Sequence, residues 1–454
     1  MLQVEVLETS ELGDRSYVAH DGEVAIVVDP QRDIDRVEAA LADRGLRCAA
    51  VVETHIHNDY VTGGFELARR TGADYLVNGE DPVQFDRLAV GDGDTHEVGG
   101  LRVTALATPG HTVTHLSYLV EDASGAEEPA AVFTGGSLLY GSVGRTDLVD
   151  ADRTEELTRA QFHSARRLAE LPGDVRVFPT HGFGSFCSSG SASGGDSSTI
   201  ADERLRNDAL TAPDEDSFVE TLIANLTAYP AYYKHMAPRN LQGPGPADLS
   251  PPAPVDPEQL RKSIEAGEWV VDLRSRTAYA GQHLAGSVGI EIGDQFSTYL
   301  GWLMPWGSAL TLIADSAEEI ETAQRQLVRI GIERPDGAAV GEVADLAADP
   351  GQLESYERAT FADLAALSTE ERAGIVVLDA RRDDERHEDA VRDSLHLPLH
   401  SLLVRMEEVP DAPVWIYCAS GFRASIAASL LARAGHDVTL IDDDFAQVAE
   451  LGLN

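Results

Sequence analysis

An internal repeat in the C-terminal half of the chain constrains the fold more tightly than any other feature of this sequence. Leu310–Ile332 aligns without gaps with Val414–His436, and upstream Val270–Arg274 resembles Val377–Arg381. Each copy has the pattern of a strand, a loop, a second strand and a helix, which is typical of an α/β unit. Self-similarity of this kind predicts two homologous α/β domains in tandem.

The first part of the chain is predicted to be a separate α/β block, because short β-type runs alternate with amphipathic helical patterns. The expected strands are Val24–Val28, Ala49–Val52, Val103–Leu106 and Ala131–Phe133, and the expected helices are Asp33–Gly45, Glu155–Leu171 and Glu203–Asn225. The Ser- and Gly-rich segment 188–198 is predicted to be a flexible loop, and the Pro-rich stretch 244–257 an interdomain linker. We therefore expect three domains, over residues 1–247, 256–346 and 356–454.

The charge of the chain excludes two classes of partner. Its net charge is −42, from 35 basic and 77 acidic residues, and a field of that sign repels nucleic acid and anionic membranes. No stretch approaches the length of about 18 apolar residues that a membrane helix needs. The first residues alternate like a strand rather than a signal peptide, and with three cysteines in the chain we expect no disulfide framework. A cytoplasmic location is expected.

A cysteine stands at a strand-to-helix turn in the second repeat. The apolar strand Val414–Tyr417 ends at Cys418, and a short loop containing Gly421 and Arg423 leads into the helix Ala424–Ala434. Unpaired backbone N–H groups and the positive end of a helix dipole favour a thiolate over a thiol. Glycine lets the backbone curl around the sulfur, and the arginine adds permanent positive charge. The pattern predicts a catalytic nucleophile; the alternative is a buried cysteine of the core.

These residues resemble the C-x-x-G-x-R active loop of the rhodanese (sulfurtransferase) family, and the resemblance extends over residues 356–454. It implies a double displacement, in which Cys418 takes a sulfur atom from a donor such as thiosulfate and passes it to a thiol or cyanide. In the first repeat Ala314 stands opposite Cys418, and Glu319 stands opposite Arg423. We therefore expect residues 256–346 to keep a rhodanese-like fold without its chemistry.

Histidines follow several predicted strands of the first block. His55 and His57 come after the strand that ends at Val52, and Asp59 follows them. His111 lies in Thr-Pro-Gly-His-Thr, and His181 lies in Pro-Thr-His-Gly. Because strand ends and the turns behind them bring such side chains together, the set predicts a metal site.

This pattern resembles the metallo-β-lactamase fold, and within it the persulfide dioxygenase branch, over nearly all of residues 1–245. Fusion of such a domain to rhodanese units is a known family arrangement. The expected fold class is thus α/β, with a metallo-β-lactamase αββα sandwich followed by two rhodanese-like α/β domains with parallel sheets. The resemblance also implies a mononuclear iron, which in that family is held by the residues at His55, at His111 and at an aspartate that is Gly136 here.

Two departures from the family pattern affect the metal site. Gly136 supplies no ligand, and Tyr60 replaces the last histidine of the signature, although Asp59 and His181 of the second metal position remain. The residues left for one divalent metal, Fe(II) or Zn, are His55, His57 and His111, with Asp59 or Asp147 as candidates by position to fill the gap. A front domain without metal is the alternative.

The resemblance also implies substrate contacts. Arg145 is similar to the family residue that pairs with the carboxylates of a glutathione-type substrate, a task that suits a forked cation, and Tyr232 lies in a second matching segment. A structural salt bridge is the alternative for Arg145. For Cys187, close to His181, a redox role is open beside a structural one. Homo-oligomers are common in the family.

Three hypotheses about function follow. In the first, the front domain oxidises or otherwise processes a low-molecular-weight thiol persulfide, and Cys418 transfers sulfane sulfur. In the second, the front domain is a metal-dependent hydrolase, for instance of a thioester. In the third, it is a degenerate binding platform, and only the sulfurtransferase is active.

Overall fold

The computed structural model describes residues 2–124, 130–189 and 195–454. By its contacts the chain divides into two compact units, the first comprising Met1–Asp248 and Val328–Gly331, the second comprising Leu249–Leu327 and Ile332–Asn454. Residues 190–194 of the predicted flexible loop lie outside the described residues. The three-domain partition at 1–247, 256–346 and 356–454 remains a prediction.

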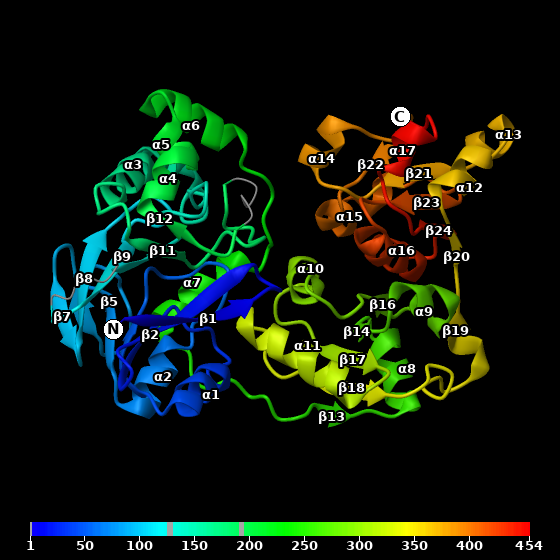
Figure 1. Ribbon diagram of the computed structural model, residues 1–454. Helices are drawn as coiled ribbons and strands as arrows, with labels where there is room; N and C mark the ends of the chain where they lie inside the picture. The colour runs from blue at the N-terminus through cyan, green and yellow to red at the C-terminus, as the bar shows by residue number, and fades with distance from the viewer. Residues whose placement is uncertain (1, 125–129, 190–194) are drawn as a thin grey trace. The chain divides into compact units, whose positions relative to one another are not determined.

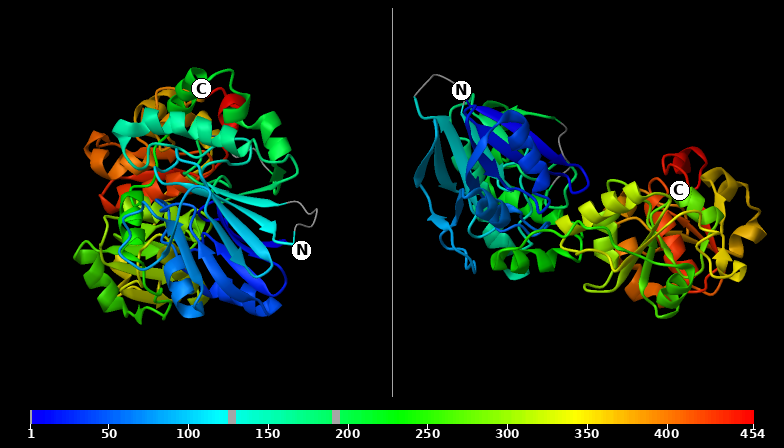
Figure 2. Two further views of the ribbon diagram at one scale, coloured as in Figure 1. Left: turned by 90° about the vertical axis from the view of Figure 1, so that its left-hand side faces the viewer. Right: turned by 90° about the horizontal axis from the view of Figure 1, so that it is seen from below.

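The first unit contains two six-stranded sheets (Figures 1 and 2). Strands of sheet I are paired in sequence order, antiparallel from β1 to β3 and parallel from β3 to β6. They are β1 (Gln3–Thr9), β2 (Asp14–His20), β3 (Val24–Val28), β4 (Arg47–Val52), β5 (Asp74–Asn78) and β6 (Leu88–Val90). Sheet II has the order β12 (Ser198–Thr199), β11 (Arg176–Pro179), β10 (Ala131–Gly135), β9 (Leu116–Asp122), β8 (Leu101–Ala107) and β7 (Thr95–Val98).

Three apolar clusters hold the first unit together in layers. One lies between the sheets and joins side chains of sheet I such as Tyr17 and Ile26 to side chains of sheet II such as Tyr118 and Phe133. A second joins sheet I to α1 (Asp35–Arg44) and α2 (Gly64–Thr71). A third joins sheet II to α3 (Thr154–Leu168) and the helices that follow it. Figure 1 shows the two sets of helices on opposite sides of the sheets. This is the predicted αββα sandwich.

The segment Glu203–Asn225, which was predicted to be helical, is divided among three helices. They are α4 (Ile200–Arg206), α5 (Asp208–Thr211) and α6 (Glu215–Ala224), and α7 (Tyr233–Gln242) ends the unit. Asn207 has extended backbone and accepts a hydrogen bond from the Ala209 N–H, so it ends one helix and begins the next. Asp214 caps α6 in the same way. Such side chains compete with helical hydrogen bonds, so they mark helix ends rather than interiors.

The second unit repeats one parallel sheet twice. The first copy has the order β13 (Ala253–Pro254), β18 (Gly337–Val340), β17 (Leu310–Ala314), β14 (Trp269–Asp272) and β16 (Val288–Gly289). The second has the order β20 (Glu357–Ala359), β24 (Val438–Ile441), β23 (Val414–Tyr417), β21 (Val376–Asp379) and β22 (Leu395–His396). Every pairing in both is parallel. A two-stranded antiparallel sheet of β15 (His283–Leu284) and β19 (Leu353–Glu354) stands apart. The predicted α/β class is therefore confirmed.

The helices of the second unit also follow the repeat. They are α8 (Pro257–Glu265), α9 (Arg276–Gly281), α10 (Phe296–Leu303) and α11 (Ala317–Arg329), then α12 (Phe361–Ala366), α13 (Thr369–Ala373), α14 (Asp383–Glu388), α15 (Leu399–Arg405), α16 (Phe422–Arg433) and α17 (Gln447–Glu450). The matching motifs make the same buried ion pair: Arg274 with Asp272 and Arg381 with Asp379. Among the described residues no helix is long and apolar enough to cross a membrane.

Candidate metal centre and cysteine loop

The predicted histidines meet in the first unit because each follows the end of a strand. His55 and His57 follow β4, His111 follows β8, and His181 follows β11. All four are almost completely buried. The His55 ring lies 4.8 Å from the His111 ring and 5.3 Å from the His181 ring, measured between centroids. The structure therefore brings these side chains into one cluster.

Hydrogen bonds fix the tautomers of two of these rings. Nδ1 of His111 lies 2.7 Å from the Arg145 carbonyl oxygen, which can only accept, so Nδ1 carries the proton. The Nε2 atom of His111 then carries a lone pair, and it has no hydrogen-bond partner within the described part of the chain. Nδ1 of His181 lies 2.8 Å from Asp14 Oδ1, which leaves its Nε2 facing His55. Carbonyl and carboxylate partners of this kind orient metal-binding imidazoles.

The geometry of the cluster fits a divalent metal ion. Nε2 of His55 and Nε2 of His181 are 3.3 Å apart. Two nitrogen ligands of one tetrahedral ion, each at about 2.0–2.1 Å, are separated by about 3.3 Å. The donor atoms of His55, His57 and His181 lie within 4.8 Å of one another, and so do those of His111, His181 and Cys187.

Burial and neighbouring charges divide the cluster into neutral and charged rings. Burial, with the neighbouring histidines, holds the pKa of His55 well below its usual range and lowers the pKa of His111 to about 3. Burial opposes protonation of His181 too, but Asp59 and Asp14 raise its pKa well above the usual range. Burial and the charge of Asp59 raise the pKa of Asp14 to about 8. Neutral imidazoles can bind a metal ion directly, whereas His181 must give up a proton on binding one.

His57 differs from the other rings in the partners of its Nε2 atom. Nε2 lies 3.3 Å from Glu53, 3.4 Å from Asp29 and 3.0 Å from the Tyr60 hydroxyl. The Tyr60 ring also stacks on His57, with centroids 4.2 Å apart. Nδ1 of His57 makes no hydrogen bond in the described structure. A donor atom of His57 lies within 4.8 Å of those of His55 and His181. Tyr60, which replaces the last histidine of the family signature, therefore contacts His57 and does not offer an imidazole to a metal ion.

Space around His111 accounts for the glycine in place of the family aspartate. A Cβ atom at Gly136 would lie 2.2 Å from Cδ2 of His111, and one at Gly144 would lie 2.7 Å from Nδ1. The imidazole therefore occupies the volume where a side chain at position 136 would begin. The two carboxylates proposed to fill the gap differ. Asp147 pairs with Arg145 through two hydrogen bonds. Asp59 lies 3.2 Å from Nδ1 of His181, but neither of its oxygens makes a hydrogen bond in the described structure.

The residues predicted to bind substrate are buried. The Arg145 guanidinium donates to Asp147, to the Phe186 carbonyl and to the Thr227 carbonyl, and it is 2% exposed. Tyr232 is also 2% exposed and packs edge-on against Tyr233. Their contact with a substrate remains a prediction.

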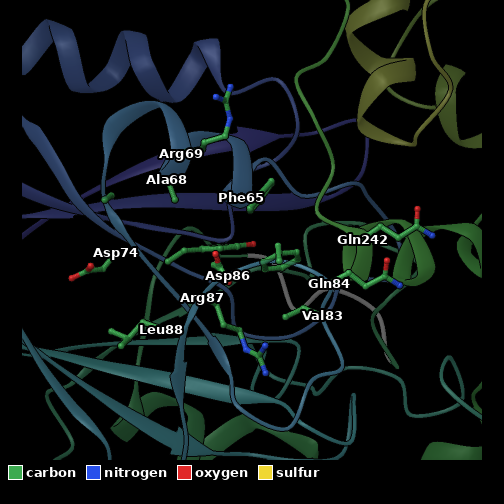
Figure 3. A pocket seen from close by; sticks show the side chains of 13 residues that line it. Phe65, Ala68, Arg69, Asp74, Val83, Gln84, Asp86, Arg87, Leu88 and Gln242 are labelled. Atoms are coloured by element: carbon green, nitrogen blue, oxygen red, sulfur yellow. The ribbon is translucent and has the colours of Figure 1, made fainter.

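A surface pocket of about 950 Å³ lies elsewhere in the first unit (Figure 3). It is lined by Phe65 and Arg69 of α2 and by Phe85 of the loop between β5 and β6. None of the predicted site residues lines it. Tyr75 also lines this pocket, and its hydroxyl donates to Glu53 over 2.9 Å.

The cysteine loop lies between β23 and α16, as predicted. Cys418 is 1% exposed. Gly421 has φ of 90°, and a Cβ atom there would lie 2.3 Å from Asp442 Oδ1, so only glycine fits the turn. The Arg423 guanidinium makes two hydrogen bonds to Glu385, at 2.5 and 2.6 Å. Its charge is therefore shared with a carboxylate instead of being free beside the sulfur.

The first repeat contacts this loop. Arg276 donates from Nε to Asp442 over 2.7 Å, and its second terminal nitrogen lies 3.4 Å from the Ser420 carbonyl oxygen. The Tyr299 ring packs edge-on against Phe422 with centroids 5.6 Å apart. At the matching position of the first repeat, Glu319 Oε2 accepts from the backbone N–H groups of Asp315 and Ser316, at 2.9 and 3.2 Å.

Several of these residues were not predicted from the sequence. Asp14, at the start of β2, stands far from every histidine motif and has no signature of its own. His115 supports the cluster, because its Nε2 accepts from the Gly136 N–H and its ring stacks on His55. Arg276 lies in the other repeat from the loop that it contacts. The spacing of residues within a single motif therefore could not predict the roles of these three residues.

Two family models match this chain. Residues 14–181 match the metallo-beta-lactamase superfamily, and residues 360–451 match the rhodanese-like domain.

Known proteins are similar to different parts of this chain. The hydroxyacylglutathione hydrolase of Acidiphilium cryptum is 38% identical over 169 residues, which span 36% of this chain and 62% of the hydrolase. The human mitochondrial persulfide dioxygenase ETHE1 is 29% identical over 245 residues, 53% of this chain and 80% of that protein. A crystal structure of a metallo-beta-lactamase from Staphylococcus aureus subsp. aureus COL superposes with a TM-score of 0.67 at 26% identity, covering 75% of this chain and 99% of that chain.

Proposed function

Because the chain belongs to the metallo-beta-lactamase superfamily and carries a C-terminal rhodanese-like domain, we propose that it is an enzyme of sulfane-sulfur metabolism. Cys418 carries sulfur as a persulfide, and the metal centre of the front domain processes a low-molecular-weight thiol persulfide. The observation that carries this proposal is the position of Cys418, which is buried at a strand-to-helix turn that Gly421 closes.

The sulfur-transfer reaction uses the Cys418 thiolate in two steps. The thiolate attacks the outer sulfur of thiosulfate, the S–S bond breaks, and sulfite leaves with the bonding electron pair. Cyanide or an acceptor thiolate then attacks the terminal sulfur and returns Cys418 as a thiolate. Backbone N–H groups before α16 can stabilise the anionic terminal sulfur. Since Cys418 is 1% exposed, a small donor suits the site better than a protein persulfide.

A sulfurtransferase assay tests this half of the proposal. Thiosulfate and cyanide should give thiocyanate with the full-length protein, and Cys418→Ser should abolish the product. Cys48→Ala changes another buried cysteine, in β4, and should keep the activity. Unchanged turnover by Cys418→Ser would remove the central claim.

In the front domain, His55, His111 and His181 would hold one divalent ion, Fe(II) or Zn. Such an ion supplies Lewis-acid polarisation and, as iron, redox chemistry with oxygen. The chain itself supplies orientation: the Arg145 carbonyl and Asp14 fix the two rings, and complete burial excludes bulk water from them. The similarity to a persulfide dioxygenase supports persulfide oxidation as the reaction. Oxygen consumption with glutathione persulfide tests it, and no consumption by iron-replete protein would contradict it.

The second candidate, a metal-dependent thioester hydrolase, is supported by the similarity to hydroxyacylglutathione hydrolase. The contact between Tyr60 and Nε2 of His57 argues against the paired metal site that such hydrolysis normally uses. Metal-dependent turnover of a glutathione thioester would favour this candidate. A degenerate binding platform is the third, and stoichiometric metal in anaerobically purified protein would count against it.

A further inference from the structure

Cys187 lies beside the histidine cluster although no part of the proposed chemistry uses it. The loop from His181 to Cys187 turns at Gly182 and Gly184, which have φ of 107° and 100°. The backbone of Arg145 fixes its end, because the Arg145 N–H donates to the Cys187 carbonyl over 2.8 Å. The side chain is fully buried. The sulfur is therefore held in the interior by a loop built around it.

The same segment of backbone also fixes His111. The Arg145 carbonyl accepts from Nδ1 of His111, and the Arg145 N–H holds Cys187. The donor atoms of His111, His181 and Cys187 lie within 4.8 Å of one another. Donors of one tetrahedral ion bound by nitrogen and sulfur are about 3.3–3.7 Å apart. A shift of about 1 Å would therefore bring the three onto one ion.

The unpartnered nitrogen of His111 is an independent sign of a ligand. Its Nε2 atom is completely buried and accepts no hydrogen bond in the part of the chain that the structure describes. A buried acceptor left in this state costs free energy unless something binds it. The Cys187 sulfur makes a long contact of 3.9 Å with the Tyr233 hydroxyl.

The charge of the site points in the same direction. Gly136 provides no carboxylate, and the His111 ring blocks the space where one would begin. Asp14 and Asp59 both lie beside Nδ1 of His181, at 2.8 and 3.2 Å, and not beside its Nε2 atom. Asp147 is committed to Arg145. In the group of His111, His181 and Cys187, the thiolate of Cys187 is the anionic donor.

We propose that Cys187 is a thiolate ligand of the divalent metal ion that His111 and His181 bind. It supplies the negative charge that a carboxylate would otherwise bring. Together with His55, the ligand set of three imidazoles and one thiolate suits Zn, Co(II) or Fe(II). On binding, the thiol gives up its proton and the sulfur forms the bond to the metal, with no oxidant or reductant needed. This inference rests on the proposed metal centre but not on the reaction assigned to it.

Cobalt(II) loading of the full-length protein under anaerobic conditions tests the ligand directly. A thiolate bound to Co(II) gives a sulfur-to-metal charge-transfer band in the near ultraviolet. The wild-type protein should bind one equivalent and show the band. Cys187→Ser should lose the band and bind cobalt at least about tenfold more weakly. Cys48→Ala and Cys418→Ser, which change the other two cysteines, should keep both.

A second variant separates loss of the ligand from loss of the fold. Cys187→Asp puts a carboxylate in place of the thiolate and should bind stoichiometric cobalt without the band. Cobalt binding by the wild type with no band, or a band that persists in Cys187→Ser, would overturn the inference and leave the metal centre standing. Absence of cobalt binding in every protein would overturn both. A band in a protein that consumes no oxygen with glutathione persulfide would support the ligand and contradict only the dioxygenase reaction.

Discussion

Arg276 and Asp442 join the two rhodanese-like repeats at the cysteine loop, with 2.7 Å between Nε and Oδ1. Asp442 Oδ1 is also the atom that leaves no room for a side chain at Gly421. The same arginine pairs with Glu291 in its own repeat. The repeat without a nucleophile therefore takes part in shaping the loop of the repeat that has one.

Arg276→Ala should slow sulfur transfer by about tenfold, because a displaced loop misaligns the nucleophile. The loss should appear in kcat for thiosulfate and cyanide, with KM changed less. Arg261→Ala removes an arginine of the same repeat that pairs only with Glu258 and Glu265 among the ion pairs of the structure, and it should leave the rate unchanged. Equal rates for Arg276→Ala and the wild type would mean that the contact does not position the loop.

Gly136→Asp restores the family carboxylate, yet it should destabilise the protein. A Cβ atom at that position lies 2.2 Å from the His111 ring, so either the ring or the strand end must move. Overpacking of a buried site costs about 1–3 kcal/mol, which urea unfolding of the metal-free protein would measure. Gly245→Asp is the matched control, because no atom lies within 4 Å of its Cβ position. A stable Gly136→Asp with tighter metal binding would show that the carboxylate fits.

Tyr60→Phe should lower the free energy of unfolding by about 1–2 kcal/mol, since it removes a hydrogen bond to a buried charged group. Burial disfavours the imidazolium of His57, but Asp29 raises its pKa to about 9, so the ring is charged at neutral pH. The Tyr60 hydroxyl lies 3.0 Å from Nε2 of that ring. Tyr229→Phe makes the same change on a half-buried ring and should cost less than about 0.5 kcal/mol. Equal losses in the two variants would contradict the role given to Tyr60.

Asp81→Asn should stabilise the protein at pH 7.5 but not at pH 4. Burial raises the pKa of Asp81 to about 6, above the value of about 3.9 in the unfolded chain, so the folded state binds more protons between these values. The stability that this group contributes is complete below about pH 4 and is lost as the pH rises through 6. The amide avoids that loss and should gain about 1–2 kcal/mol at pH 7.5. Chemical unfolding at both pH values measures the gain.

An exposed neighbour provides the control for that experiment. Asp86→Asn lies on the same loop and should stay within about 0.5 kcal/mol of the wild type at pH 7.5. A gain for Asp81→Asn that is as large at pH 4 as at pH 7.5 would contradict the assignment to this carboxyl group.

The sequence alone was enough for the two parallel sheets and for the αββα sandwich. The strands of the two repeats pair in the same order, and the aligned motifs at Asp272 and Asp379 form the same ion pair. The histidines could be expected to meet because each ends a strand. The α/β character followed from local periodicity, whereas the αββα sandwich and the parallel sheets were implied by the resemblance to the two families.

The side-chain orientations in the cluster could not be predicted in this way. His57 and His181 both looked like ligands by spacing, but Asp29 and Glu53 draw Nε2 of His57 to themselves, whereas Asp14 leaves Nε2 of His181 facing His55. The choice depends on which carboxylates pack behind each ring. Glu53 lies four residues before His57, but Asp14 and Asp29 lie far from the histidine motifs in the sequence, so no motif records those two.

Glu319 gives the first repeat a ligand of its own. Its carboxylate accepts from the backbone N–H groups of Asp315 and Ser316, at the turn where the second repeat places its cysteine loop. The turn is therefore occupied by an intramolecular anion, much as an inhibitor occupies an active site. A cysteine introduced at Ala314 alone would face a cradle that is already full, so two changes, not one, separate this repeat from catalysis.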